Sequence, residues 1–173
     1  MLGFELIGTG SEIIGLNCVS HWQRFKFPYG AQLVWLEGRL TASDAGRHIL
    51  LCHAPLLAHN PKRGDTKPYL SRDTQLQKIV DAHRNILFIS GHTHISMESP
   101  VNGVEHDEAR NNIYLNDGSI RPTTRLTADG RPEAEPADGT VSELLLEERQ
   151  VKITAISTKT SQSVFCGQFY FPE

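Results

Sequence analysis

The chain has few cysteines, no long apolar run and little net charge. Its three cysteines, Cys18, Cys52 and Cys166, are odd in number and widely spaced among 173 residues. This argues against a disulfide framework and predicts a reducing, cytoplasmic location. Lysine and arginine number 17 and aspartate and glutamate 20, which gives a net charge of −3. We therefore expect no polybasic surface and no nucleic-acid partner.

The sequence also lacks the features of membrane, secreted and disordered chains. No segment approaches the roughly 20 apolar residues that cross a bilayer. The first residues have neither the basic start nor the long apolar core of a signal peptide. The hydrophobic content of 39% excludes a disordered, collagen-like or coiled-coil chain. Together with the length, these absences predict a single domain over 1–173 with no membrane partner.

A strand, a helix and a second strand form the centre of the predicted fold. Residues 48–52 and 86–90 are continuous apolar runs, which are typical of strands buried on both faces. A helix that Ser71 or Asp73 can cap runs between them to His83. Because such a crossover joins parallel neighbours, the two strands are predicted to pair in parallel.

The remaining elements give an α/β fold with an antiparallel tail. Leu33, Leu36 and Leu40 share one face of a predicted helix over 30–42, although Gly38 weakens it. The other expected elements are strands at 4–8, 13–19 and 112–115, an exposed loop over 120–140, and an antiparallel β meander over 141–173.

Histidines follow both central strands. His53 comes directly after the first apolar run, and His92 and His94 come directly after the second. Ligands of open α/β sheets lie at the carboxyl ends of the strands, so these three imidazoles are predicted to converge on one crevice. Neutral imidazole binds Mn, Fe or Zn. A histidine after a buried strand is also often a hydrogen-bonded structural residue, and the spacing alone leaves both interpretations open.

These motifs resemble the C-terminal half of the calcineurin-like metallophosphoesterases. The matching segments are 30–36, His53-Ala54-Pro55, Gly91-His92-Thr93-His94 and Leu115-Asn116-Asp117-Gly118-Ser119. The resemblance implies the βαβ-containing half of a metallophosphoesterase-type sandwich, so that 1–173 is a single partial domain. It also implies hydrolysis of phosphomonoesters or phosphodiesters by metal-activated water, and a cyclic-nucleotide phosphodiesterase branch is compatible with it.

The resemblance also assigns metal ligands. In that family, the residues that match His53 and His92 bind one ion of a dinuclear centre, and the residue that matches His94 binds the other. We therefore expect Mn, Fe or Zn at His53, His92 and His94, with at most partial occupancy. Arg63 and Lys67, on the polar segment after His53, are predicted to attract the phosphate of a small-molecule substrate. No catalytic residue is assigned.

Half of the family's pattern has no counterpart in this chain. The motif G-N-H does not occur in the sequence. Asp81-Ala82-His83 fits D-x-H in letters, but it falls in a predicted helix. Gly64-Asp65 fits the start of G-D-x-x-D, but it falls in a loop. The isolated chain is therefore predicted to have little activity. The alternative is a non-catalytic interaction module that self-associates through surface left bare, or that pairs with a chain carrying the missing motifs.

Four further residues near these motifs are not expected to bind a ligand. Cys52 precedes His53 on a strand, so its side chain is predicted to point into the core. His59 is expected to be a surface residue. Asn116 and Asp117 precede Gly118 and are predicted to form a turn rather than to bind a ligand.

Overall fold

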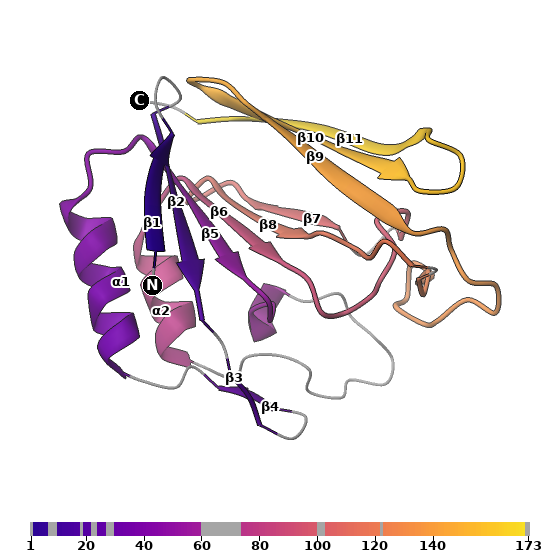
Figure 1. The fold of residues 1–173 in the computed structure, drawn as a ribbon, viewed down its shortest axis with the longest axis horizontal. Coiled ribbons are helices and arrows are strands. Elements are labelled where there is room, and N and C mark those ends of the chain that lie inside the picture. Colours follow the sequence, from indigo (N-terminus) through magenta and orange to yellow (C-terminus); the bar gives the residue numbers. More distant parts are fainter. Residues whose placement is uncertain are drawn as a thin grey trace.

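The protein consists of three layers, with a six-stranded sheet in the middle. The computed structural model describes residues 2–6, 10–17, 19–21, 24–26, 30–59, 74–99, 103–121 and 123–171. Two helices cover one face of the central sheet, and a three-stranded sheet covers the other (Figure 1). The predicted α/β class with an antiparallel C-terminal meander is confirmed.

The central sheet is parallel in its middle and antiparallel at both edges. Its strands, in spatial order, are β1 (Leu2–Leu6), β2 (Ser11–Leu16), β5 (Arg47–Cys52), β6 (Ile86–Ser90), β8 (Asn112–Asn116) and β7 (Val104–Asp107). The predicted parallel pairing of β5 with β6 is confirmed, with Leu50 opposite Phe88. Because β2, β5, β6 and β8 all run in parallel, their carboxyl ends meet at one edge of the sheet.

Both helices form where the apolar spacing predicted them. Helix α1 (Gly30–Ala42) buries Leu33, Leu36 and Leu40. Gly38 lies on its solvent side, where a Cβ would meet nothing within 4 Å, so it does not interrupt the helix. Helix α2 (Thr74–Ala82) likewise buries its apolar side chains against the central sheet. Its predicted caps, Ser71 or Asp73, lie outside the described residues. No described helix is long and apolar enough to cross a membrane.

Successive side chains of the central strands point to opposite faces of the sheet, so the interior consists of two hydrophobic cores. On β6, Ile86 and Phe88 face the helices, whereas Leu87 faces the second sheet. That sheet consists of β9 (Thr140–Leu146), β10 (Gln150–Ser157) and β11 (Ser163–Tyr170), with β10 in the middle. Burial of a strand on both sides is the reason why the central strands are continuously apolar.

Several elements differ from the prediction. The first two strands are shifted toward the N-terminus, and β2 begins directly after Gly10, whose φ of 60° accommodates the turn. The short strands β3 (Val19–His21) and β4 (Arg24–Lys26), the single-turn 3-10 helix η1 (Leu57–His59) and the edge strand β7 were not expected. The segment 120–140 is exposed only in part, because Leu126 and Ala137 are buried.

A buried arginine fastens the second sheet to the central one. Arg47, at the start of β5, is 1% exposed, and its Nε donates a hydrogen bond to Ser11 Oγ at 2.7 Å. Its Nη1 and Nη2 donate to the carbonyl oxygens of Gln150 and Glu147 at 3.0 and 2.6 Å. The guanidinium also lies 5.0 Å from the ring centre of Phe171. Arg47 thus holds the β9–β10 turn against the amino-terminal end of the parallel strands.

Candidate functional site

Two of the three predicted ligands lie side by side at the carboxyl ends of β5 and β6. The strands end in register, with Cys52 opposite Ser90, so His53 and Gly91 follow them as neighbours. The amide of Gly91 donates a hydrogen bond to the carbonyl oxygen of His53 at 3.2 Å. The rings of His53 and His92 meet edge to face, with 5.1 Å between their centres and 66° between their planes. The structure therefore brings these two imidazoles together.

The backbone of the Gly-His-Thr-His loop is left-handed at both histidines. His92 has a φ of 71° and His94 a φ of 53°. Such values are uncommon outside glycine, and strained backbone of this kind is concentrated at functional sites. Two such residues within three positions mark this loop as one that the surrounding structure holds in place.

Neighbouring segments brace this loop. Asn116, at the end of β8, donates a hydrogen bond from Nδ2 to Thr93 Oγ1 at 2.5 Å. The amide of Thr124 donates to the carbonyl oxygen of His94 at 3.1 Å, and Thr124 accepts from the amide of Ser96 at 2.9 Å. Thr124 therefore links the segment 120–140 to the histidine loop. Asn116, predicted as a turn residue, is one of these braces.

The electrostatics of the cluster favour a neutral His92. Burial, and then the nearby imidazoles of His53 and His94, lower the pKa of His92 from 6.5 to about 4. At neutral pH this ring is uncharged, which is the form that can offer a lone pair to a cation or a proton. His94 lies on the same loop, two residues after His92.

An acidic residue lies next to the histidine loop, and the sequence analysis did not identify it as a candidate ligand. Asp117 follows β8, and its amide donates to the carbonyl oxygen of Ser90 at 2.8 Å. A Cβ at Gly91 would lie 3.0 Å from Asp117 Oδ1, so glycine is what allows the carboxylate this close approach. Burial raises the pKa of Asp117, whereas His53 and His94 lower it. The signal that could have identified Asp117 is its place after a third parallel strand.

The donor types of this cluster suit a divalent metal ion, but their number falls short of a whole centre. Among the residues that the structure describes, no group of three or more His, Cys, Asp or Glu side chains is placed to hold a metal ion. His53 and His92 supply two neighbouring imidazoles, which fit one side of a coordination sphere. The predicted site of three histidines therefore stays a prediction. The geometry of the described residues suits a metal ion bound by His53 and His92.

The pKa of His92 gives a measurable pH dependence. The folded value of about 4 lies below the ordinary 6.5, so between these values the unfolded chain binds a proton that the folded chain does not. The free energy of unfolding is therefore expected to fall as the pH drops from 6.5 toward 4. Urea titrations at pH 7.5, 6 and 5 measure this slope, which the variant His92→Gln should reduce. An equal slope in both proteins would contradict the assignment.

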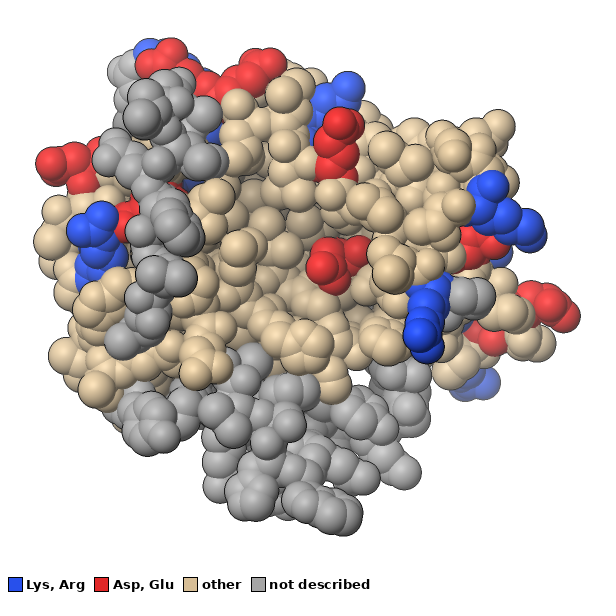
Figure 2. Space-filling view, viewed as in Figure 1, with Lys and Arg blue, Asp and Glu red and all other residues tan. Residues whose placement is uncertain are grey.

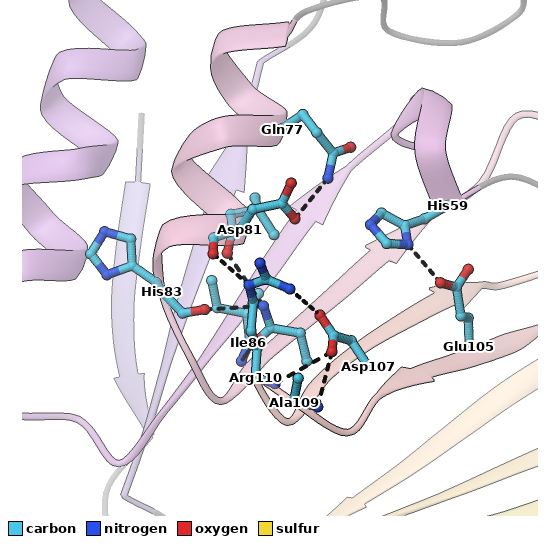
Figure 3. Close-up of polar contacts among 11 residues, drawn as sticks. His59, Gln77, Asp81, His83, Ile86, Glu105, Asp107, Ala109 and Arg110 are labelled. Carbon is cyan, nitrogen blue, oxygen red and sulfur yellow. Dashed lines mark hydrogen bonds and ion pairs between the residues drawn. The ribbon is translucent and has the colours of Figure 1, made fainter.

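Other candidates from the sequence lie elsewhere. Arg63 and Lys67 fall outside the described residues. Asp81, on helix α2, accepts a hydrogen bond from Gln77 at 2.9 Å, and its carbonyl oxygen accepts one from Arg110 at 2.6 Å (Figure 3). Asp81 thus belongs to a polar network with Arg110 beside β7. This agrees with the interpretation that Asp81-Ala82-His83 is not a metal motif.

Two histidines have partners that the sequence did not suggest. His59 was expected at the surface, but it is half-buried and stacks on Tyr114 with 3.5 Å between ring centres. Its Nδ1 lies 2.8 Å from Glu105 Oε1 (Figure 3). His48 lies 3.6 Å from the carboxylate of Glu12, which is 2% exposed.

The side chain of Cys52 is buried in the core, as predicted, on the side of the sheet that the helices cover.

Comparison with known proteins identifies the fold. No family model and no curated protein matches the sequence. The chain is similar to GAP50, the anchor in the inner membrane complex of Plasmodium, with 18% identity and a TM-score of 0.55 over 94% of this chain. It is also similar to the purple acid phosphatase PPD1 from yellow lupin (Lupinus luteus) seeds, with 13% identity and a TM-score of 0.51 over 94% of this chain.

These likenesses cover only part of the similar proteins. The chain spans 50% of the length of the first and 31% of the length of the second. At such low identity they show the architecture and not the activity. The chain has the metallophosphoesterase fold that the resemblance predicted, over the part of that fold that it spans.

Proposed function

We propose that the chain carries the histidine side of a metal-dependent phosphoesterase site, in which His53 and His92 bind the ion. The observation that carries this proposal is the pair of imidazole rings, 5.1 Å apart, at the ends of adjacent parallel strands. A divalent ion bound there supplies a water of lowered pKa and a positive charge opposite the phosphoryl oxygens. The substrate class is a small-molecule phosphate ester.

The chain's own residues prepare the site for this role. His92 is neutral at pH 7, so it can bind a cation without first losing a proton. The hydrogen bond from Asn116 to Thr93 holds the loop on which His92 lies. Asp117 adds a carboxylate next to Gly91, at the start of the same loop. Arg63 and Lys67 are part of the same proposal, as cations that attract the phosphate.

The proposal also explains why this chain alone is expected to be a poor catalyst. The sequence has no D-x-H, G-D-x-x-D or G-N-H motif in a suitable context. Two imidazoles leave most of a coordination sphere to other ligands. We therefore assign binding of the ion to these residues, and hydrolysis to a complete centre that needs ligands from outside this chain.

One observation favours a second candidate, a non-catalytic interaction module. Two large apolar side chains are exposed on one face of β9, with Val141 at 49% and Leu145 at 53%. Surfaces of this kind take part in association between chains. Under this candidate the chain self-associates and its histidines bind no metal. Sedimentation velocity over a hundredfold range of concentration separates a self-associating chain from a monomer.

The function is tested by adding Zn²⁺ to the metal-free chain while recording histidine ring resonances by NMR. The rings of His53 and His92 are expected to change together, with saturation at one ion per chain. His106 provides an internal control, because it lies on β7 with its Nε2 2.9 Å from Asn111 Oδ1. Changes at His106 alone, or at neither member of the pair, would show that the proposed site does not bind the ion.

A further inference from the structure

The segment 53–59 crosses from the end of β5 to the far strands of the central sheet. His53 follows β5, and the 3-10 helix η1 ends at His59, whose ring stacks on Tyr114 of β8. Because β6 lies between β5 and β8, the segment spans about 10 Å across the sheet. Figure 1 shows η1 beyond the end of β5. His53 and His59 are therefore the two ends of one short segment.

Contacts hold this segment at its start and at its middle. The carbonyl oxygen of His53 accepts a hydrogen bond from the amide of Gly91 at 3.2 Å. Leu56 is buried in the core that the helices cover, and its carbonyl oxygen accepts a hydrogen bond from the amide of His59 at 3.1 Å. The side chain of His53 is itself exposed. Its place beside His92 therefore depends on the backbone that carries it.

Two neighbouring strands hold the end of the segment. Glu105 on β7 and Tyr114 on β8 lie directly opposite each other, so their side chains share one face of the sheet. The imidazole of His59 lies flat on the Tyr114 ring, with 3.5 Å between ring centres and 5° between planes. Its Nδ1 lies 2.8 Å from Glu105 Oε1 (Figure 3). The stack fixes the plane of the imidazole, and the carboxylate fixes the direction of Nδ1.

The stack is the stronger of these two contacts. The side chain of His59 is 14% exposed and Tyr114 is buried, so water is largely excluded from between the rings. Tyr114 lies opposite Phe88 of β6, with 6.3 Å between ring centres. The side chain of Glu105 is 53% exposed, and an ion pair with so exposed a partner contributes little. A flat ring at position 59 is therefore what holds the segment on β8.

We propose that His59 is a positioning residue for His53. Its stack on Tyr114 holds the far end of the segment, so that the backbone presents the imidazole of His53 to that of His92. A ligand that is already in place loses less conformational entropy when it binds an ion, so the ion binds more tightly. The effect on ion binding rests on the proposed function, whereas the effect on the place of the His53 ring does not.

The placement of the imidazoles matters because little else on the visible surface would attract a cation. Figure 2 shows acidic side chains scattered among basic ones, and the described residues of this face form no broad acidic patch. The affinity of the histidine pair for an ion is therefore expected to depend on how firmly His53 is held beside His92.

Two measurements on the whole chain test this role. In the metal-free chain, the NOE between ring protons of His53 and His92 reports their contact, which has 5.1 Å between ring centres. The variant His59→Ala is expected to lose at least about half of this NOE, because the released segment moves as a loop does. It should also weaken Zn²⁺ binding about fivefold to tenfold, which is less than the loss of a ligand, because no donor is removed.

Conservative variants separate the stack from the ion pair. His59→Phe keeps a flat ring on Tyr114, so the NOE and the Zn²⁺ affinity should stay within about twofold of the wild type. Glu105→Gln keeps an oxygen beside Nδ1 and should also change both by less than about twofold.

His106→Ala is the matched control. His106 follows Glu105 on β7, so its side chain lies on the opposite face, where its ring contacts Phe169 with 5.5 Å between centres. The control therefore removes a histidine with an aromatic partner from the same region without touching the segment 53–59. Neither the NOE nor the Zn²⁺ affinity should change.

The outcomes separate the positioning role from the proposed function. If the NOE weakens in His59→Ala but the wild type binds no Zn²⁺, His59 positions His53 and the proposed function fails. If the NOE of His59→Ala matches that of His106→Ala, or if His59→Phe loses as much of it as His59→Ala, the role of the stack is overturned. A loss of Zn²⁺ affinity with an unchanged NOE would also overturn it, because His59 would then act on the ion and not through His53.

Discussion

Replacement of Arg47 by leucine is expected to lower the free energy of unfolding by about 3–5 kcal/mol. The side chain is 1% exposed, and three of its nitrogens donate hydrogen bonds, one to Ser11 within the central sheet and two to the β9–β10 turn of the second sheet. Leucine fills part of the volume but donates no hydrogen bond, so the carbonyl oxygen of Glu147 loses the donor Arg47, and that of Gln150 keeps the amide of Glu147. The contact of the guanidinium with Phe171 is lost as well.

Urea denaturation with circular dichroism measures this effect. Arg131→Leu is the matched control, because Arg131 is 79% exposed and pairs with Asp129 at the surface. Surface pairs of this kind contribute little, so the control should leave the free energy of unfolding nearly unchanged. Arg47→Lys should fall between the two, since lysine keeps the charge without the planar fork. An Arg47→Leu variant as stable as the control would contradict the role assigned to Arg47.

Replacement of His92 by alanine is expected to weaken Zn²⁺ binding at least about 100-fold at pH 7. This ring is one of the two imidazoles that the structure places together, and burial keeps it neutral. His53→Ala should have an effect of similar size. His94→Ala should weaken binding only about threefold, because the contact between ring centres at 5.1 Å joins His53 to His92, and no third donor is placed with this pair among the described residues.

Competition with a chromophoric chelator measures these affinities, and circular dichroism confirms that each variant folds. His106→Ala is the control, since His106 lies on the edge strand β7. If His92→Ala bound Zn²⁺ as tightly as His106→Ala, the assignment of His92 would be wrong. If His94→Ala matched His92→Ala, a three-histidine centre would replace the two-histidine one.

The parallel core could be predicted from the sequence because its signals are local. The apolar runs that became β5 and β6 are continuous, and the leucines of α1 recur at helical spacing. The rule that ligands gather at the carboxyl ends of parallel strands then placed His53 and His92 on one edge. Their positions followed from the order of elements along the chain and needed no knowledge of distant contacts.

The features that sequence analysis missed depend on contacts between distant segments. Asp117 lies in an Asn-Asp-Gly sequence that is typical of a turn, and it reaches the histidines only because β8 pairs with β6. Arg47 bonds to Ser11, 36 residues away, and to Glu147 and Gln150, 100 and 103 residues away. The left-handed backbone at His92 and His94 has no local signal, because such angles are expected mainly of glycine.

The edge strand β7 was missed for a different reason. Its sequence, Val-Glu-His-Asp, has no apolar alternation, because an edge strand on the surface buries little of either face. The prediction that 120–140 is an exposed loop was wrong in part, because contacts with a distant segment bury some of its residues. Leu126 is buried there because its amide bonds to Ser99 Oγ at 2.9 Å, which draws the segment onto the residues that follow the histidine loop.

The central claim is best tested by crystals of the chain soaked in Zn²⁺, with diffraction data collected at the zinc absorption edge. The account predicts one anomalous peak at the carboxyl ends of β5 and β6, about 2.1 Å from a ring nitrogen of His53 and from one of His92. A peak bound by other residues, or no peak beside the ring of His53, would contradict it.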